Sequence, residues 1–132
     1  MDSSTSTKQK LIIYGRSLGT AVALHLASKH QPQQLILESP FYQFIQDRLK
    51  VFFPFGLRSE FANFSYFPQI DCPITITHGT NDWIVSLNSA EKLKPLLKPG
   101  DQFIVINGGG HKNLREFDDY HKELEKVINL RW

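Results

Sequence analysis

Four short, mainly apolar runs recur along the chain, and each is followed by glycine, proline or polar residues. They are rich in isoleucine, leucine, valine and threonine, and they cover residues 11–14, 35–38, 74–77 and 103–106. Near-continuous runs of this kind are typical of strands buried on both faces, as in a parallel sheet. The pattern therefore predicts four strands of one mostly parallel sheet.

The segments after these strands place apolar residues every three or four positions, which is the helical period. The predicted helices cover residues 17–30, 41–53, 86–97 and 113–130. In the first helix, Leu18, Val22 and Leu26 share one side, which predicts a helix packed closely against another element, and Pro32 should end the helix. Alternating strands and helices predict an α/β fold with helices on both faces of the sheet.

The third and fourth predicted helices carry further signals. Ser86 or Asn88 can cap the start of the third helix, because a short polar side chain accepts a backbone N–H there. The fourth helix is amphipathic, with apolar positions at Leu114, Phe117, Leu124, Val127 and Ile128. A basic set with helical spacing predicts a solvated face, and it consists of Lys92, Lys94 and Lys98.

The chain length of 132 residues fits one domain, which we place at residues 9–132. The polar residues 1–8 are expected to be disordered. Residues 41–70 are aromatic and contain prolines after the helical period of residues 41–53 ends. We expect this segment to form a cap-like region of helical and irregular structure.

Composition narrows the functional classes. The chain is 41% hydrophobic and 21% charged, which is typical of a globular protein. Its net charge of +2, without a basic run that contains aromatic residues, argues against a nucleic-acid partner. No apolar stretch of about 18 residues predicts a transmembrane segment, and no signal peptide is recognisable, so we expect a cytoplasmic chain. The single cysteine, Cys72, excludes an intrachain disulfide.

The first predicted strand runs into the sequence GRSLG, which fits the pattern G-x-S-x-G with Gly15, Ser17 and Gly19. This pattern needs a strand, a sharp turn and a helix, and that context is predicted here. The turn would expose the Ser17 hydroxyl, and we expect both glycines to be needed because a side chain there would strike a neighbouring element. The alternative is a serine that only caps the helix.

Two further residues follow later strands. Asp82 lies in HGTNDWIV after the third strand, and His111 lies in INGGGHKNL after the fourth. Each alone can be an ordinary loop residue, although three glycines before His111 suggest a mobile loop that brings a histidine into a crowded site. The carboxyl ends of parallel strands form one edge, where sites are built. Ser17, Asp82 and His111 therefore predict one site, in the order Ser, Asp, His.

These motifs resemble the α/β-hydrolase superfamily, and in particular the branch of Bem46-like proteins and depalmitoylating serine hydrolases. The matching stretches are YGRSLG, LILESPF, PITITHGTND with a following IV, and GGGH. The resemblance implies that Ser17 is a nucleophile, His111 a general base and Asp82 the group that orients it. It also implies that the backbone N–H of Leu18 is an oxyanion donor. The substrate class would be carboxylic esters or thioesters, including acyl-protein esters, and a peptidase is less expected.

No phosphate loop or G-x-G-x-x-G follows any predicted strand, which argues against a nucleotide-binding α/β domain. We expect no cofactor and no metal. Arg16 and Glu38 also match the branch and either pair to brace the turn or are surface charges. His78 is expected to be structural. Three histidines are expected to be solvated or to pack on helices, namely His25, His30 and His121. Phenylalanines of the cap-like segment either fill the core or line an acyl pocket, and they are Phe52, Phe53, Phe55, Phe61, Phe64 and Phe67.

The resemblance is to the C-terminal half of the fold, without the strands that precede the nucleophile strand in the family. The family's second oxyanion donor belongs to that earlier part. We therefore expect weak activity and an exposed edge on the first strand, through which copies of the chain can associate. The alternative function is a non-catalytic fragment or interaction module that keeps the hydrolase fold.

Overall fold

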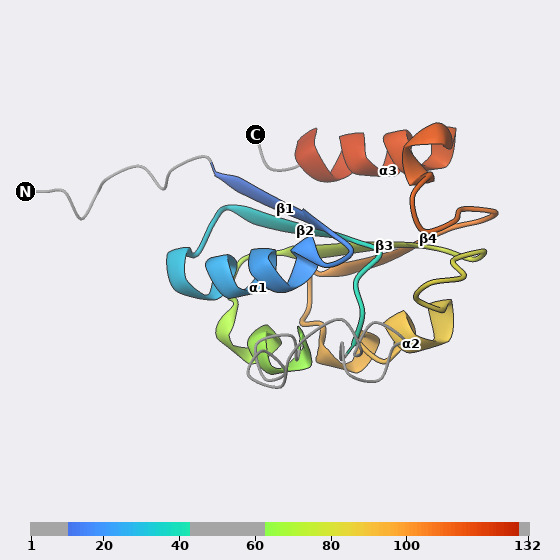
Figure 1. Cartoon of the computed structure of the whole chain (residues 1–132). Helices are drawn as coiled ribbons and strands as arrows, with labels where there is room; N and C mark the ends of the chain where they lie inside the picture. Colours follow the sequence, from blue (N-terminus) through green and yellow to red (C-terminus); the bar gives the residue numbers. More distant parts are fainter. Residues whose placement is uncertain (1–10, 43–62, 130–132) are drawn as a thin grey trace, which may run out of the picture.

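The computed structural model describes residues 11–42 and 63–129, and it contains one parallel sheet of four strands (Figure 1). The strands are β1 (Ile12–Arg16), β2 (Gln34–Glu38), β3 (Ile74–Gly79) and β4 (Gln102–Ile106). They lie in the order β1-β2-β3-β4, and every neighbouring pair is parallel. The predicted α/β fold is confirmed. The first strand is longer than predicted and runs through Gly15 to Arg16, directly before Ser17.

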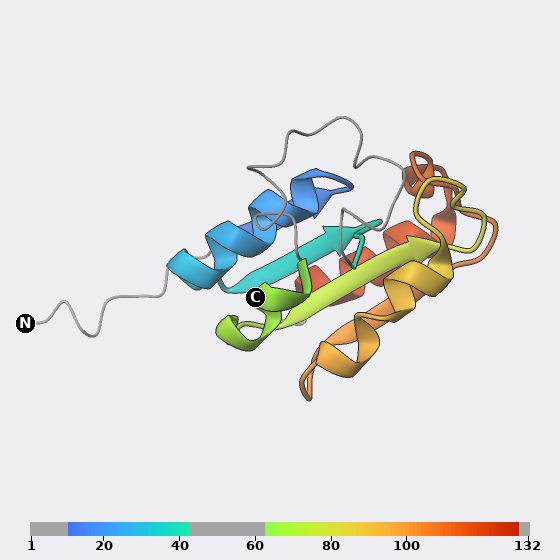
Figure 2. The ribbon, with the colours of Figure 1, turned by 60° about the horizontal axis from the view of Figure 1, so that its bottom comes forward.

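Helices cover both faces of the sheet, as the two views in Figures 1 and 2 show. One face carries α1 (Gly19–His30), the 3-10 helix η5 (Asn63–Gln69), α2 (Leu87–Glu91) and the 3-10 helix η6 (Lys94–Leu96). The other face carries α3 (Asp118–Asn129), which follows the 3-10 helix η7 (Leu114–Glu116). Within the described residues, no helix is long and apolar enough to cross a membrane.

The main core lies between the sheet and the helices α1 and η5. Leu35, Leu37, Ile74 and Ile76 alternate along β2 and β3, so all four point to this face. They pack with Ala23, Leu24, Ala27, Phe67, Ile70, Cys72 and Leu93. A smaller core on the other face joins Ile106 to Leu114 and Tyr120. The site described below lies at the carboxyl ends of the strands, beside these two cores.

Helix α1 packs with a different side from the predicted one. Leu18, Val22 and Leu26 are exposed, and Val22 has 57% of its surface accessible. The buried side consists of Thr20, Ala21, Ala23, Leu24 and Ala27. The reason is close packing at Gly15, where a Cβ would lie only 2.6 Å from the Ala23 Cβ. Small residues let the helix approach the strand, whereas the larger apolar side points outward.

The third predicted helix is interrupted. Ser86 is its cap, as predicted, and its side chain accepts the N–H of Ser89 at 3.1 Å. The α-helix ends at Glu91 because Pro95 lacks a backbone N–H and its ring would clash with the carbonyl of Glu91. The chain continues as a 3-10 helix instead.

The fourth predicted helix is also divided, because Phe117 is extended between η7 and α3. Residue 130 lies outside the described residues. The basic face is only partly correct, since Lys98 is half-buried. Its Nζ donates to the Cys72 carbonyl at 2.6 Å and lies 3.1 Å from the Asp101 carboxylate.

Most of the predicted cap-like segment lies outside the described residues, as do the predicted disordered residues 1–8, most of the predicted helix 41–53, and Phe52, Phe53, Phe55 and Phe61. Within the described part, residues 63–69 form η5, and Phe67 is buried in the core. Phe64 is half-buried and stacks on Tyr42 with 4.9 Å between ring centroids.

Candidate active site

The residues predicted from the motifs meet at the carboxyl edge of the sheet. Ser17 directly follows β1, Asp82 lies in the loop after β3, and His111 lies in the loop after β4. In Figures 1 and 2 the loops after β3 and β4 lie side by side at this edge. Three segments that are far apart in sequence therefore bring their side chains into contact.

Ser17 occupies a strained turn between β1 and α1. Its φ is 53°, in the left-handed region that residues other than glycine rarely adopt. The Ser17 N–H donates to the Glu38 carbonyl at 2.9 Å, and its own carbonyl accepts the Thr20 N–H at 3.0 Å. These bonds hold the hydroxyl away from the sheet and toward the loops.

The two glycines beside Ser17 differ in their surroundings. A Cβ at Gly15 would lie 2.6 Å from both the Ala23 Cβ and the Gly19 carbonyl oxygen, so the expected need for glycine is correct there. A Cβ at Gly19 would meet nothing within 4 Å. The expected clash at Gly19 is therefore wrong, because this residue is the first of α1 and its open side faces away from the strand.

His111 connects the other two residues. Its Nε2 lies 2.7 Å from the Ser17 Oγ, and its Nδ1 lies 2.8 Å from the Asp82 Oδ2. Because a carboxylate only accepts, Nδ1 carries the proton and Nε2 is free to accept the serine hydroxyl. The His111 side chain is 8% exposed, and that of Asp82 is fully buried. This arrangement can draw a proton from Ser17 and hold the resulting positive charge beside a carboxylate.

Asp82 is fixed by its own loop. Its Oδ1 accepts the N–H of Ile84 at 2.9 Å and that of Val85 at 2.8 Å. Burial acts to raise the pKa of this carboxyl, but the hydrogen bonds from His111 and Val85 outweigh it, and the pKa lies below its usual value. Asp82 is therefore ionised at neutral pH, as an orienting carboxylate must be.

A glycine at the end of β3 and glycines after β4 let the two loops meet. A Cβ at Gly79 would lie 2.1 Å from the Gly109 carbonyl oxygen. The Asn81 N–H donates to this same carbonyl at 2.8 Å, and the Gly108 N–H donates to the Thr80 hydroxyl at 2.8 Å. We expected the glycines before His111 to give mobility. The structure gives Gly109 another role, which is the close approach of two backbones.

Leu18, the predicted oxyanion donor, directly follows Ser17 and precedes α1. Among the described residues, no acceptor is hydrogen-bonded to its N–H. The helix start adds partial positive charge at this point. A developing negative oxygen beside Ser17 would therefore meet a free donor.

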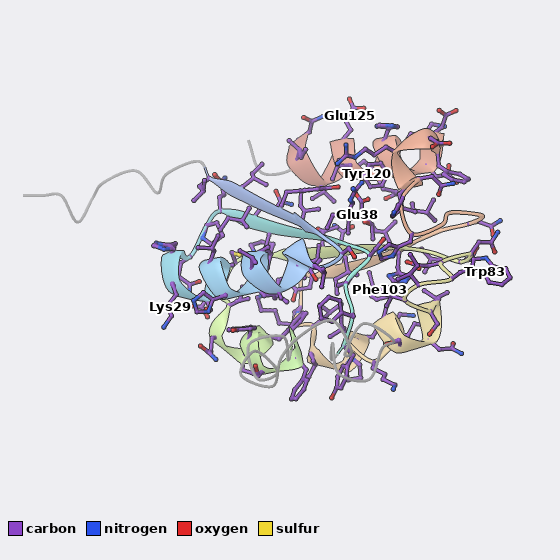
Figure 3. All side chains as sticks on the ribbon, viewed as in Figure 1. Lys29, Glu38, Trp83, Phe103, Tyr120 and Glu125 are labelled. Carbon is purple, nitrogen blue, oxygen red and sulfur yellow. The ribbon has the colours of Figure 1, made fainter. Side chains whose placement is uncertain are left out.

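Glu38 is not a surface charge and has tyrosines as its partners. Its side chain is buried between β2 and α3, close to Tyr120 in Figure 3. The hydroxyls of Tyr14 and Tyr120 both donate to its Oε1, the latter at 2.9 Å. Of the two alternatives, surface charge holds for Arg16, which is exposed, and neither holds for Glu38, whose partners are the two tyrosines. Since the Glu38 carbonyl also accepts the Ser17 N–H, the cluster ties α3 to the turn that holds Ser17.

The tyrosines of this cluster hold their protons strongly. Burial is the main cause that raises the pKa of Tyr14, and the hydrogen bond to Glu38 adds to it. Burial also raises the pKa of Tyr120, followed by its hydrogen bonds to Tyr14 and Glu38. Both phenols are therefore neutral donors at any physiological pH.

Stability is expected to fall above pH 10 because of this cluster. An unfolded tyrosine ionises near pH 10, whereas Tyr14 and Tyr120 stay protonated to higher pH when folded. The folded chain then binds more protons, so the free energy of unfolding falls as the pH rises. The buried Tyr120 contributes up to about 1.4 kcal/mol per pH unit, and the more exposed Tyr14 contributes less because solvent screens its interactions. Urea unfolding at pH 9 and 11 measures this fall. Tyr120→Phe should make this fall shallower; equal slopes in the wild type and the variant would contradict the account.

The remaining histidines divide between surface and interior. His25 and His30 are exposed on α1, and His25 meets the edge of the Tyr66 ring. His121 is exposed on α3, with its Nε2 2.5 Å from the Arg115 carbonyl oxygen. His78 is fully buried, and its Nε2 lies 3.3 Å from the Asp82 Oδ2. In the part of the chain that the structure describes, no group of three or more histidine, cysteine, aspartate or glutamate residues could hold a metal ion.

Two features of the site were not predicted from the sequence. Trp83 is 92% exposed and, in Figure 3, lies at the end of the molecule beyond β3. Ser39 directly follows β2, has a φ of 53° and is buried. The signal for Trp83 was its position beside Asp82, because an aromatic residue in a polar loop is unusual. No local signal marks Ser39.

The chain is similar in sequence to α/β-hydrolase domain-containing proteins. It is 25% identical over 127 residues to the α/β-hydrolase domain-containing protein aho-3 of Caenorhabditis elegans. This alignment covers 93% of this chain and 37% of the relative. It is 27% identical over 127 residues to the α/β-hydrolase domain-containing protein 17C of Homo sapiens. This alignment covers 92% of this chain and 37% of the relative. The chain thus spans about two fifths of the curated relatives that it matches. No protein-family model matches the chain.

Solved structures share the fold. An α/β-hydrolase enzyme from a lagoon-sediment metagenome superposes with a TM-score of 0.73 and 22% identity, covering 94% of this chain and 63% of that one. The esterase domain of a Rhodothermus marinus protein gives a TM-score of 0.68 and 18% identity, and the match covers 89% of this chain and 57% of that domain's chain. The expected resemblance to the α/β-hydrolase superfamily is confirmed, and the match covers part of that fold.

Proposed function

We propose that the chain carries the catalytic residues of a serine hydrolase that acts on carboxylic esters or thioesters. The observation that supports this most directly is the unbroken chain of contacts from the Ser17 Oγ through His111 to Asp82, at 2.7 and 2.8 Å. The similarity to hydrolases in sequence and fold agrees with it. Ser17 is the nucleophile, His111 the general base, and Asp82 the residue that orients His111.

The reaction proceeds in two halves. The Ser17 Oγ attacks the carbonyl carbon while His111 Nε2 takes its proton, and the carbonyl oxygen becomes an anion that the Leu18 N–H stabilises. The carbon–oxygen or carbon–sulfur bond then breaks, and His111 returns the proton to the leaving alcohol or thiol. Water repeats these steps on the acyl-enzyme, which releases the acid and restores Ser17.

Two properties of the site bear on the substrate and the rate. The residues that follow Ser17 and Asp82 in the sequence are apolar and exposed, namely Leu18, Trp83 and Ile84, which favours a substrate with an apolar acyl group over one with a charged group. The described residues provide the Leu18 N–H as oxyanion donor. If it acts without a second donor, turnover is lower by about 10²–10³-fold.

A fluorophosphonate probe tests the proposal. Such a probe is attacked by an activated serine and stays bound to it, so we expect one label per chain, on the peptide that contains Ser17. The matched control is the same protein in urea, which should not be labelled because the contacts to His111 are lost. A folded sample without label would instead support the non-catalytic interaction module.

The edge position of β1 supports association between copies of the chain. In the described sheet, β1 pairs with β2 alone, and Leu11 and Tyr14 at this edge are more than one third exposed. Free backbone groups and apolar side chains on an edge strand favour pairing with another strand. Light scattering on the labelled sample would separate a monomer from a dimer.

A further inference from the structure

We propose that His78 is a positioning residue of this site, whose Nε2–H holds the loop of residues 82–85 closed and keeps the Asp82 carboxylate directed at His111. The effect on catalysis rests on the proposed function, whereas the effect on the Asp82–His111 contact does not. His78 precedes the last residue of β3 and is fully buried.

A closed set of contacts links His78 to this loop. The His78 Nε2 lies 2.7 Å from the Val85 carbonyl oxygen and 3.3 Å from the Asp82 Oδ2. The Val85 N–H donates to the other oxygen of Asp82 at 2.8 Å. Val85 is therefore held on both of its backbone groups, one by His78 and one by Asp82.

The contacts also define the tautomer of His78. A carbonyl oxygen only accepts, so Nε2 carries the proton and donates it to Val85, while the Asp82 Oδ2 lies 3.3 Å from the same nitrogen. The Nδ1 atom is buried and has no hydrogen-bond partner among the described residues. A second proton there would be a buried donor without an acceptor, which is costly.

The charged neighbours of His78 do not favour its protonated form enough to replace the neutral one. Burial is the main cause that lowers the pKa of His78, and it outweighs the opposing influence of Val85, Asp82 and Glu91. His111 faces His78 across Asp82 and acts in the same direction as burial. His78 therefore stays neutral at working pH and acts as a fixed donor rather than as a second base.

Two variants with side chains of similar length separate the effect of the His78 Nε2–H donor from the effect of the volume of the side chain. In His78→Gln, the amide nitrogen can reach the place of the imidazole Nε2 and donate to Val85. In His78→Met, the side chain has a similar length but no donor. We expect His78→Gln to keep the fluorophosphonate labelling rate within about threefold, and His78→Met to lower it by about 10²-fold, as a misplacement of about 1 Å does.

A second readout does not depend on activity. The proton between His111 Nδ1 and Asp82 gives a low-field NMR resonance, which should be kept in His78→Gln and lost or moved upfield in His78→Met. Thermal denaturation checks that both variants fold. An unchanged resonance in a folded His78→Met protein would overturn the proposal, as would equal losses in both variants. If the wild-type chain is not labelled at all, the proposed function fails, while the resonance still decides the role of His78.

Discussion

Replacing Asp82 by asparagine is expected to lower the rate of Ser17 acylation by about 10⁴-fold while the fold stays intact. The reason lies in the backbone of the loop. Oδ1 accepts two N–H groups, from Ile84 and Val85, so an asparagine must keep its carbonyl oxygen at this position. Its NH₂ group then points at His111 in place of Oδ2.

That orientation forces the wrong tautomer on His111. An NH₂ group donates, so Nδ1 must accept, and the proton moves to Nε2. Nε2 is the atom 2.7 Å from the Ser17 Oγ that should take the serine proton. The histidine then cannot act as a base. The NH₂ group also faces the N–H of His78, which adds a repulsion between donors.

Fluorophosphonate labelling and ester hydrolysis both measure this effect. Ser17→Ala defines the background rate, and Asp71→Asn makes the same chemical change at an exposed position. Circular dichroism confirms that the variants fold. If a folded Asp82→Asn protein keeps a tenth or more of the wild-type rate, Asp82 does not orient His111 in the reaction.

Gly79→Ala is expected to destabilise the chain by about 3 kcal/mol and to separate the loops of Asp82 and His111. The new Cβ would lie 2.1 Å from the Gly109 carbonyl oxygen and 2.9 Å from the Gly109 Cα. These are backbone atoms, so no side-chain rotation relieves the clash. Overpacking of this kind costs about 1–3 kcal/mol and occasionally more. Thermal denaturation should show a Tm lower by about 10 °C.

Gly19→Ala is the matched control, because a Cβ there meets nothing within 4 Å. It should melt within a few degrees of the wild type, or slightly higher, since alanine favours a helix more than glycine does. The labelling rate should fall in Gly79→Ala even at temperatures where the variant is folded. Equal melting temperatures for the two variants would show that the loops can separate without cost.

The strands could be predicted because each is a local apolar run, and the meeting of Ser17, Asp82 and His111 could be predicted because carboxyl ends of parallel strands share an edge. The buried side of α1 could not. Its sequence offers two apolar sides, and the choice depends on how closely the helix approaches Gly15. The helical period alone identifies an apolar side of the helix, but it does not say which element that side packs against.

The contacts around the site also depend on the folded chain. Tyr120 reaches Glu38 from the far end of the sequence, and no local pattern links the two. His78 looked structural because it ends a strand, but whether it touches Asp82 depends on the turn between them. Pro95 differs from these cases, because its effect on the third helix is local and could be predicted from the sequence.

The parallel order of the strands has a consequence for how the chain reaches its working form. Pairing Ile12 with Gln34 needs only the β1–α1–β2 unit, but Leu35 must pair with Ile74 across a longer stretch of chain. Loop closure across such a distance is slow relative to local contacts. We therefore expect the turn around Ser17 to form before Asp82 and His111 reach it, because these two residues need β3 and β4 in place. Labelling of Ser17 should then return later in refolding than the β1–α1–β2 unit.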